Sequence, residues 1–567
     1  MNANAATANS GAISWHHWSA EPFESAKELN KLIIVNVGYE GCTACRYMDE
    51  NTFRDPRVIE LLEKNFVSIQ VDSEARPDIG ERYSDWAWPA TAFLHPDGRQ
   101  IFAIRGSRRA AKFATMLENL IARQKSGQLQ VDGRAPYGSP DDPVTEPLVE
   151  ILAQVRRQLD RSFDDKRGGW GSNVKILEYP GPTLQLFMRA HLYADDQARS
   201  RALLTTAGFT QQTDSVWGGF FYASINSWTN TIKEKLLETQ AAALRIFADA
   251  LQISGEDIYR QSIAEVDRYL QSHMRSQSGL LFSSQKDLNA DLKGIDSDAY
   301  YELDEKSRRA ITEPRTDRAT YTDLNARVAN AYARAYQVTK IAEYEQRARE
   351  IMSVIIERRR QEAGWYVQIE TATQDDLGQR AHVLTTAPRP FLRTQAYTGL
   401  ALLRLYQITD DDAWLNAAKE LAVAVLNHLE DKELGGFFAT NSADNIDNYL
   451  KPRKPLEDNA AIAMFFHWLG VLEKNDDYLA KAEAIIRAVA TPEVVKREGR
   501  ITGNLAMALE LLINGYVEMS VVGDREDPAS KALFEAAHKA YEPRKVVHFE
   551  APGRYPRRED PSLYVCN

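Results

Sequence analysis

Two of the three cysteines in this 567-residue chain, Cys42 and Cys45, lie within the stretch "GYEGCTACRYM". A pair at this spacing can open and close a disulfide, supply half of a metal site, or only hold the fold together. Zinc would need two more ligands, and the sequence offers only Cys566 and scattered histidines, without an HExxH pair. We therefore expect no metal and no cofactor, and the pair favours thiol–disulfide chemistry over a purely structural role.

The residues around the pair predict where its sulfurs lie. Before it, "NKLIIVNVG" has the continuous Leu, Ile and Val pattern of a buried strand, and after it "CRYMDENTF" can form a helix. Cys42 thus falls where a helix begins, and the unpaired N–H groups and the helix dipole there stabilise a thiolate. Cys45 follows one turn later on the same face, within disulfide reach. We expect an exposed attacking thiol at Cys42 and a sheltered resolving thiol at Cys45.

The elements that follow complete an α/β domain over residues 1–128. "DPRVIELLEKN" has the spacing of an amphipathic helix, and "FVSIQVD" is a second strand. "WAWPATAFLHPDGRQIFAIRG" predicts a hairpin around a Pro-Asp-Gly turn, and "AAKFATMLENLIARQKSG" predicts a closing helix. The order of strand, helix, strand, hairpin and helix predicts an open sheet with helices on its faces.

Ordered matches to a known family pattern run through this domain. The pattern is approximately W-x-x-W, A-K, G-Y-x-x-C-H-W-C-H-x-M and F-V-x-I-K-V-D-R-E-E-R-P-D-I. The matching residues are Trp15, Trp18, Ala26, Lys27, Gly38, Tyr39, Cys42, Cys45, Met48, Phe66, Val67, Val71, Asp72, Glu74, Arg76, Pro77 and Asp78. On these residues the segment resembles the thioredoxin-like domain of the spermatogenesis-associated protein 20 type.

The resemblance implies catalytic roles for Cys42 and Cys45 and supporting roles for their neighbours. By analogy with thioredoxins, Pro89 would be a cis-proline that sits against the cysteine pair and aligns a substrate strand. The same analogy adds Trp88 and Tyr39 as supporting residues. The implied partner is a protein dithiol or disulfide, as substrate or as reductant.

The chain also departs from the family pattern near the cysteines. Thr43, Ala44 and Arg46 replace the histidines and the tryptophan of the family. Arg46 can favour a thiolate electrostatically, but it cannot carry a proton near neutral pH as histidine can. Asn36 stands where thioredoxins have a buried aspartate that helps to deprotonate the resolving thiol. We expect thiol–disulfide exchange that is slower than in the family, or a cysteine pair with a different reduction potential.

A second, larger region follows a linker at 129–146, which is rich in Gly, Pro, Asp and Ser. A glycine-aromatic signal recurs there as "RGGWG", "WGGFFY", "SGLLF", "AGWYV" and "LGGFF", with a weaker "REGRI". Helical segments fill the intervals in pairs, starting near 147, 181, 196, 231, 255, 321, 340, 390, 411, 457, 474 and 502. Six helical hairpins predict an all-α (α/α)6 toroid over residues 147–516. In it the aromatic residues pack against hairpin ends, and a small α/β unit and tail follow at 517–567.

The family resemblance extends into this region through "GGWGSNVKILEYP", "WTNTIKEKLLETQAAAL", "YTDLNARVANAYARAY" and "LKPRKPLEDNAA". Such barrels are also the fold of several glycosidases and sugar epimerases, whose carboxylates or histidines face a central cavity. The residues that the resemblance suggests for such a cavity are Lys175, Trp228, Glu234, Lys235, Asn325 and Asp458.

Other positions weaken a hydrolase hypothesis. Ile232, Thr239 and Thr394 stand where the family has His, Asp and Asp. Glu234 and Lys235 could equally form a solvated helix face or a buried structural ion pair.

Composition narrows the classes of partner. The net charge of -11 is spread along the chain without a long basic block, which argues against nucleic acid. No apolar stretch approaches the roughly 20 residues that a membrane-spanning helix needs. The first residues lack the features of a secretory signal, so we expect a cytoplasmic protein, or a periplasmic one if a signal peptide had been removed.

Three functions remain as hypotheses. The leading one is a thiol–disulfide oxidoreductase fused to a helical barrel that recognises a protein or glycan partner. A carbohydrate-active enzyme in the barrel and a non-catalytic scaffold are the alternatives.

Overall fold

The computed structural model describes residues 12–83, 88–130, 143–171, 173–177, 181–287, 296–311, 313–370, 388–441, 452–499, 502–550, 553–556 and 558–567. The chain forms two compact units that interleave in the sequence. Unit 1 comprises Met1–Gly138, Thr371–Arg389 and Ser442–Arg453, and unit 2 comprises Ser139–Glu370, Pro390–Asn441 and Lys454–Asn567. Within unit 1, Arg453 forms an ion pair with Glu81 at 2.5 Å, although the two residues are far apart in sequence.

Unit 1 contains one five-stranded sheet. Its strands are β1 (Trp15–His16), β2 (Leu32–Gly38), β3 (Phe66–Asp72), β4 (Ala90–Leu94) and β5 (Gln100–Arg105). Their order across the sheet is β1-β3-β2-β4-β5. Strands β1, β2 and β3 are parallel, β4 is antiparallel to β2, and β5 is antiparallel to β4. The predicted order of elements and the thioredoxin-like α/β class are confirmed.

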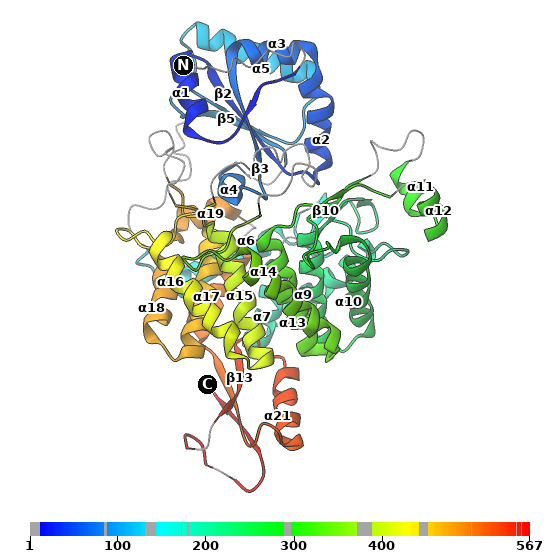
Figure 1. Ribbon diagram of the computed structural model, residues 1–567, viewed down its shortest axis with the longest axis vertical. Coiled ribbons are helices and arrows are strands. Elements are labelled where there is room, and N and C mark those ends of the chain that lie inside the picture. Colours follow the sequence, from blue (N-terminus) through cyan, green and yellow to red (C-terminus); the bar gives the residue numbers. More distant parts are fainter. Residues whose placement is uncertain are drawn as a thin grey trace. The chain divides into compact units, whose positions relative to one another are not determined.

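Helices cover both faces of this sheet. They are α1 (Ala20–Glu28), α2 (Thr43–Glu50), α3 (Pro56–Asn65), α4 (Pro77–Tyr83) and α5 (Ala110–Lys125), with a 3-10 turn at Thr52–Arg54. Ile33, Val35 and Val37 of β2 pack in the core that contains Phe23 of α1. Leu32 and Ile34 pack in the opposite core, with residues of α2, α3 and α5. Alternation along β2 therefore places Asn36 on the face that α2 covers, and α3 and α5 lie side by side on it (Figure 1).

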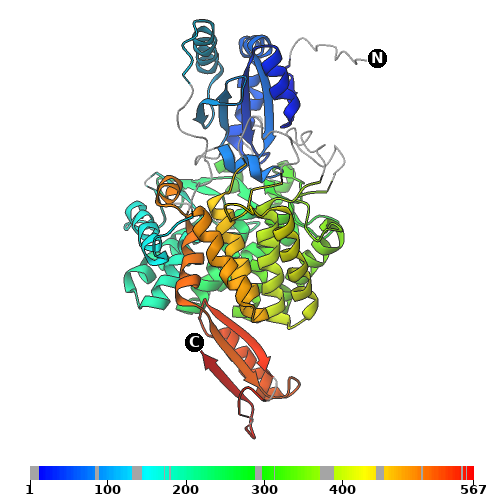
Figure 2. The ribbon, with the colours of Figure 1, turned by 90° about the vertical axis from the view of Figure 1, so that its left-hand side faces the viewer.

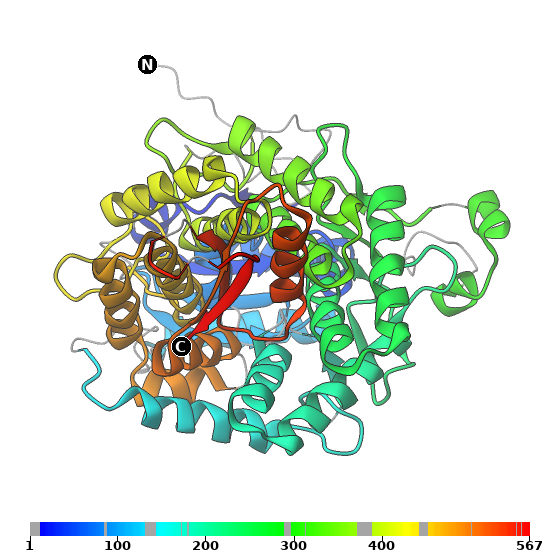
Figure 3. The ribbon, with the colours of Figure 1, turned by 90° about the horizontal axis from the view of Figure 1, so that it is seen from below.

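Unit 2 is built on twelve helices in two rings. The inner helices are α7 (Gly181–Tyr193), α9 (Leu237–Ser254), α13 (Thr322–Thr339), α15 (Leu392–Thr409), α17 (Leu456–Glu473) and α20 (Gly503–Asn514). The outer helices are α6 (Leu148–Ser162), α8 (Asp196–Phe209), α10 (Asp257–Tyr269), α14 (Ala342–Arg359), α16 (Asp412–His428) and α18 (Asp476–Val489). Each inner helix packs on the next, and α20 packs against α7 to close the ring (Figure 3). The predicted (α/α)6 toroid is confirmed.

Unit 2 also contains shorter strands and helices. The strands are β6 (Val174–Ile176), β7 (Ala223–Ile225), β8 (Thr231–Ile232), β9 (Lys235–Leu236), β10 (Ser284–Gln285) and β11 (Thr316–Asp317). The helices are α11 (Ser297–Tyr301), α12 (Glu305–Ile311) and α19 (Pro492–Glu498), with a 3-10 turn at Thr210–Gln212 and a π-helical turn at Leu270–Met274. The helix expected near 231 begins instead at Leu237, because β8 and β9 before it pair with β7 and β10.

The two kinds of connection in the barrel differ. Turns from an inner to an outer helix contain one residue with positive φ, namely Ala194, Gly255, Lys340, Asp410 and Lys474. Connections from an outer to an inner helix contain the glycine-aromatic signals, and at five of them the chain pairs across the turn. Trp170, Phe220, Tyr366 and Phe437 of these turns are buried, which confirms that they pack, whereas Tyr222, Trp365 and Phe438 are half-buried. Arg500 and Ile501 of the weakest signal lie outside the described residues.

The chain ends in a small α/β appendage that belongs to unit 2. It comprises β12 (Val517–Val522), α21 (Pro528–Lys539), β13 (Lys545–Glu550) and β14 (Ser562–Cys566). Strand β12 is parallel to β13 and antiparallel to β14, and the sheet extends from one end of the barrel (Figure 2). Among the described residues, no helix combines the length and the apolar character that crossing a membrane requires.

Candidate functional site

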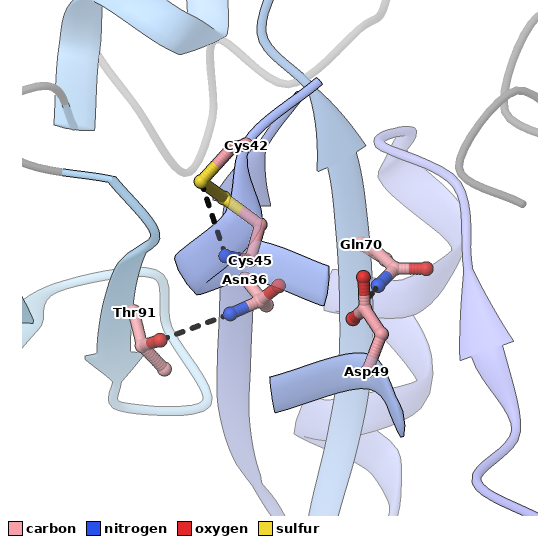
Figure 4. Close-up of a disulfide and its surroundings, with 6 residues drawn as sticks. All are labelled: Asn36, Cys42, Cys45, Asp49, Gln70 and Thr91. Atoms are coloured by element: carbon pink, nitrogen blue, oxygen red, sulfur yellow. Dashed lines mark hydrogen bonds between the residues drawn. A yellow bond between two sulfur atoms is a disulfide. The ribbon is translucent and has the colours of Figure 1, made fainter. Parts of the chain in front are cut away.

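Cys42 is the N-cap residue of α2 in unit 1. Its Sγ accepts a hydrogen bond from the backbone N–H of Cys45 at 3.0 Å. The two cysteines are joined as a disulfide, with their Cα atoms 5.2 Å apart (Figure 4). The predicted placement of both residues in the first turn of a helix is confirmed. A thiolate at Cys42 would be stabilised there by the same N–H group and by the positive end of the helix dipole.

Cys42 is only slightly more exposed than Cys45, although we expected a clear difference. Cys42 is 5% exposed and Cys45 is 0% exposed. The prediction of an exposed attacking thiol is therefore wrong. The cap geometry turns the Cys42 sulfur toward the first turn of its own helix instead of toward solvent.

The hairpin residues expected beside the pair have the predicted backbone form. The Trp88–Pro89 peptide bond is cis, as the analogy with thioredoxins implied. The carbonyl of Pro89 accepts a hydrogen bond from Gly106 N at 2.9 Å, which ties the start of β4 to the end of β5. The rings of Tyr39 and Trp88 meet edge to face, with centroids 6.3 Å apart.

Polar residues also lie on the strands under α2. Asn36 is fully buried, and its side-chain amide donates a hydrogen bond to Thr91 Oγ1 at 3.0 Å. Figure 4 shows this pair on the neighbouring strands β2 and β4. An amide does not titrate, so Asn36 cannot accept the proton that an aspartate would take from Cys45. Arg46 is 9% exposed, so its charge is held inside the fold and not at the surface.

Asp49 is a polar residue of α2 that we did not predict. It lies four positions after Cys45 and therefore on the same face of the helix. Its Oδ1 accepts a hydrogen bond from Gln70 Nε2 of β3 at 3.1 Å (Figure 4). The spacing of four could have revealed it, because a carboxylate one turn beyond a resolving thiol is a candidate proton acceptor.

In the barrel, two of the suggested cavity residues hold loops together. Lys235 Nζ lies 2.7 Å from Asp214 Oδ2 and donates to Gly218 O at 2.9 Å. Lys175 contacts Asp164 and Gly171 O in the same manner, and Lys454 pairs with Asp431 at 2.5 Å. Each aspartate precedes a Gly-Gly turn and also accepts backbone N–H groups of that turn.

Lys235 illustrates the energetics of this arrangement. Burial lowers the pKa of Lys235 to about 8, and the nearby Asp214 opposes that shift. Arg308 of α12 also contacts Asp214, at 2.9 Å. Removing one partner of such a buried ion pair strongly destabilises the folded protein, because the other charge is left buried without compensation. Lys175 and Lys235 therefore hold the turns of the barrel in place, and the buried partner of Lys235 is Asp214 instead of the neighbouring Glu234 that the sequence suggested.

A second repeated device contains Asn325. Its side-chain amide accepts from Leu281 N at 2.7 Å and donates to Leu281 O at 3.0 Å. Gln240, Gln395 and Asn459 clamp Phe220, Tyr366 and Phe437 through both backbone groups in the same manner. Each amide lies in the first turn of an inner helix. The clamp fixes the chain after the glycine turn onto that helix, and no substrate is needed to explain it.

The other three suggested cavity residues also have protein partners. Trp228 Nε1 donates to Arg167 O at 2.6 Å. Glu234 is 4% exposed and lies between β8 and β9, where its backbone carbonyl accepts from Tyr222 N. Asp458 accepts a hydrogen bond from Arg393 Nε at 3.0 Å.

The barrel has a cavity along its axis, lined by all six inner helices and by residues 541 and 543. Its volume is about 110 Å³. Small-molecule sites commonly span roughly 300–1,000 Å³, so the cavity is small for a sugar substrate. None of Lys175, Trp228, Glu234, Lys235, Asn325 and Asp458 is among the described residues that line it.

Fold and site together define a class: a thioredoxin-like unit with a cysteine pair at a helix start, joined to an (α/α)6 barrel. Residues 5–131 match the Thioredox_DsbH family model, described as a protein of unknown function, DUF255. Spermatogenesis-associated protein 20 of Rattus norvegicus is 25% identical over 309 residues, and that of Homo sapiens is 24% identical. These matches confirm the resemblance inferred from the sequence.

The extent of these matches is partial. The human and rat matches each cover 48% of this chain and 38% of the relative, so the chain matches about two fifths of the length of these curated proteins. An uncharacterized protein of Caenorhabditis elegans is 25% identical, with 48% of this chain and 41% of that protein covered.

Solved structures resemble the barrel. A D-mannose isomerase aligns with a TM-score of 0.47 and 13% identity over 65% of this chain and 100% of that one. A sugar epimerase from a ruminal bacterium aligns with a TM-score of 0.49 and 11% identity over 65% of this chain and 99% of that one. Likeness of this degree says nothing of activity, and the barrel class rests on the two rings of helices themselves.

Proposed function

We propose that the N-terminal unit is a thiol–disulfide oxidoreductase whose catalytic residues are Cys42 and Cys45. The observation that carries the proposal is the position of the two sulfurs, joined across the first turn of α2 with the Cys42 sulfur on the Cys45 N–H group. This position favours the thiolate form of Cys42 and permits reversible closure with Cys45.

The exchange conserves atoms and electrons. The Cys42 thiolate attacks one sulfur of a substrate disulfide, a mixed disulfide forms, and the other substrate sulfur leaves as a thiolate. The Cys45 sulfur, having lost its proton, then attacks Cys42 Sγ, the Cys42–Cys45 disulfide forms, and the second substrate thiolate is released. The substrate gains two electrons, and a dithiol reductant later restores the two cysteines.

Two residues bear on the proton of Cys45. Asn36 is neutral and hydrogen-bonded to Thr91, so it leaves that proton without the acceptor that a buried aspartate would provide. Asp49, one turn further along α2, is the carboxylate that this proposal assigns to the role. The substrate is a protein disulfide, and recognition of a protein or glycan by the barrel stays a prediction, as does a cytoplasmic location.

The test measures exchange on the full-length protein. Equilibration in glutathione buffers of graded potential should reveal one reversible two-electron couple, and dithiothreitol-driven reduction of insulin should depend on the enzyme. Cys42→Ser should abolish the reduction, because the attacking sulfur is missing. Cys45→Ser should accumulate a mixed disulfide at Cys42, because nothing resolves it.

The matched control is Cys566→Ser, which removes the third cysteine. Cys566 is exposed on β14, so its loss should leave the couple and the insulin rate unchanged. A wild-type protein without a reversible couple, or a Cys42→Ser variant that keeps its rate, would contradict the proposal.

A further inference from the structure

The axial cavity of the barrel carries an excess of positive charge. Three arginines line it: Arg245 of α9, Arg327 of α13 and Arg404 of α15. An adjoining smaller cavity of about 50 Å³ shares Arg245 and Arg404 with it and adds Arg334 of α13 and Lys545. The carboxylates among the lining residues are Asp249 and Glu542. A cavity with such an imbalance attracts an anion, because the surrounding low dielectric strengthens every charge.

The arginines of these cavities differ in how closely they contact a carboxylate. Arg334 Nε donates to Asp249 Oδ1 at 2.6 Å, and Arg245 Nε lies 3.5 Å from the other oxygen of the same carboxylate. Arg404 Nη1 donates to Gln337 Oε1 at 3.4 Å, which adds no negative charge. One carboxylate thus faces three guanidinium groups.

The remaining charged residues do not remove the excess. Glu542 accepts from Arg544 and contacts His191, so it is neutralised away from the arginines of the cavity. Arg327 pairs with Glu238 at 2.5 Å, and its guanidinium stacks over the Tyr397 ring at 3.8 Å. Arg327 therefore brings its own counter-charge, and the excess rests on Arg245, Arg334 and Arg404.

The pKa of the nearby Lys545 side chain reflects the same positive electrostatic field. Burial, together with the charges of Arg334, Arg404 and Lys340, lowers the pKa of Lys545 to about 6, and Glu542 opposes this shift. Lys545 Nζ donates to the carbonyls of Ala537, His538 and Ala540 at the end of α21. An anion beside these cations would relieve their mutual repulsion.

The end of the cavity is closed by the chain between α21 and β13. Gln252 of α9 donates to Lys539 O, and Arg544 Nη1 donates to Asn514 O at 2.7 Å. The His191 and Tyr541 rings meet edge to face with centroids 5.3 Å apart. The appendage is thereby attached to three inner helices, and Tyr541 is placed at the end of the cavity. Figure 3 shows this segment across the end of the barrel.

The inner helices α7, α17 and α20 add apolar residues to the cavity. They are Leu184, Met188, Met464, Met507 and Leu511, beside the ring of Trp468. Asn330 and Asn504 add neutral hydrogen-bonding groups. A ligand that matches both groups of residues has an anionic group for the arginines and a less polar body for the leucines and methionines.

We infer that the axial cavity of the barrel and the smaller cavity that adjoins it form a binding site for a small organic anion, whose carboxylate or phosphate group lies among Arg245, Arg334 and Arg404. Guanidinium groups suit this role because their paired N–H groups match the oxygens of either group. The site lies in unit 2 and does not depend on the proposed redox chemistry of unit 1.

The test is calorimetric titration of the full-length protein near neutral pH and at constant ionic strength. One arm uses inorganic phosphate and the other uses benzoate, a carboxylate with an apolar ring. We expect saturable binding of at least one of them, and the arm that binds identifies the anionic group. Saturable binding of neither in the wild-type protein would overturn the inference.

Variants connect the binding to the arginines. Arg245→Gln should weaken the affinity about tenfold or more, because it removes one of the three guanidinium groups that would hold the anion. The matched control is Arg157→Gln, the same change at an exposed position of α6, which should leave the affinity unchanged. Equal affinity of the two variants would overturn the site.

A second variant should change the affinity for the anion in the opposite direction. Asp249→Asn removes the carboxylate that competes with a bound anion, so it should tighten binding severalfold. Urea unfolding of each variant separates an effect on binding from a loss of folded protein. If Arg245→Gln does not fold, an Asp249→Asn affinity no tighter than the wild type would overturn the inference by itself.

Discussion

At the scale of single residues, the cysteine pair combines a favourable and an unfavourable setting for thiol chemistry. The start of α2 stabilises a thiolate at Cys42, and the cap hydrogen bond from Cys45 N adds to it. Asn36 occupies a fully buried position below the helix without a titratable group. Attack by Cys42 is thus supported more strongly than deprotonation of Cys45, and the resolving step should limit the rate.

Asn36→Asp tests this imbalance. Burial raises the pKa of a carboxyl group at this position, so the new side chain can take up the Cys45 proton near neutral pH. We expect insulin reduction to accelerate severalfold near neutral pH and to acquire a new ionisation in its pH profile. Stability should fall by about 1–3 kcal/mol, because the hydrogen bond from Asn36 to Thr91 is lost.

The control for this prediction is Asn36→Ala, which removes the amide without adding a carboxyl group. It should lose stability without gaining rate. A rate gain of equal size in both variants would mean that loosening of the site, and not the proton acceptor, limits exchange.

At the scale of elements, two separate constraints favour glycine in the turns of the barrel: a left-handed backbone and a lack of space for a Cβ atom. Gly219 has a φ of +71°, and a Cβ atom there would lie 2.6 Å from Cγ of Tyr269. Gly255 has a φ of +73°, but nothing lies within 4 Å of its Cβ position. The backbone conformation is therefore shared, while the crowding is specific to the glycine-aromatic turn.

Gly219→Ala should destabilise the protein more than Gly255→Ala. Each substitution places a side chain in the left-handed region at a cost of about 1–2 kcal/mol. Gly219→Ala should add about 1–3 kcal/mol through overlap with the buried Tyr269 ring. Urea unfolding of the two variants measures the difference directly, and equal losses would show that the ring moves aside without cost.

At the scale of the whole molecule, the packing of unit 2 keeps histidines in their neutral form. Burial lowers the pKa of His467 to about 4. Burial and the cations Lys340, Lys545, Arg404 and Arg334 lower the pKa of His538 well below 6.5. Unfolding exposes both rings, and each then takes up a proton below about pH 6.5. Because the unfolded state binds more protons, the free energy of unfolding falls as the pH falls from about 6.5 toward 4.

His467→Phe isolates one of these protons. Between about pH 6 and 5 it should reduce the pH slope of the unfolding free energy by up to about 1.4 kcal/mol per pH unit. Urea unfolding at several pH values measures the slope. His428→Phe, at an exposed position near the end of α16, is the control and should leave the slope unchanged. An unchanged slope in His467→Phe would mean that the buried ring titrates normally in the folded protein.

The amino-acid sequence by itself determined the two kinds of fold and the place of the cysteines. Apolar runs and helical periodicities depend on neighbouring residues, so they predicted the order of strands and helices along unit 1 and the helix pairs of unit 2. Glycine spacing predicted the turns, because the left-handed backbone conformation that favours glycine is a local property. The helix start at Cys42 followed from the strand before it and the helix after it.

Only the tertiary structure decided what the polar residues of the barrel do. Lys235 meets Asp214 and Arg308, and Asn325 meets Leu281, across separations that no local pattern encodes. The same holds for Arg245, Arg334 and Arg404, which come from three helices and share one cavity. Charge balance in a buried site is set by which distant side chains come within a few ångströms, and only the packed chain determines that.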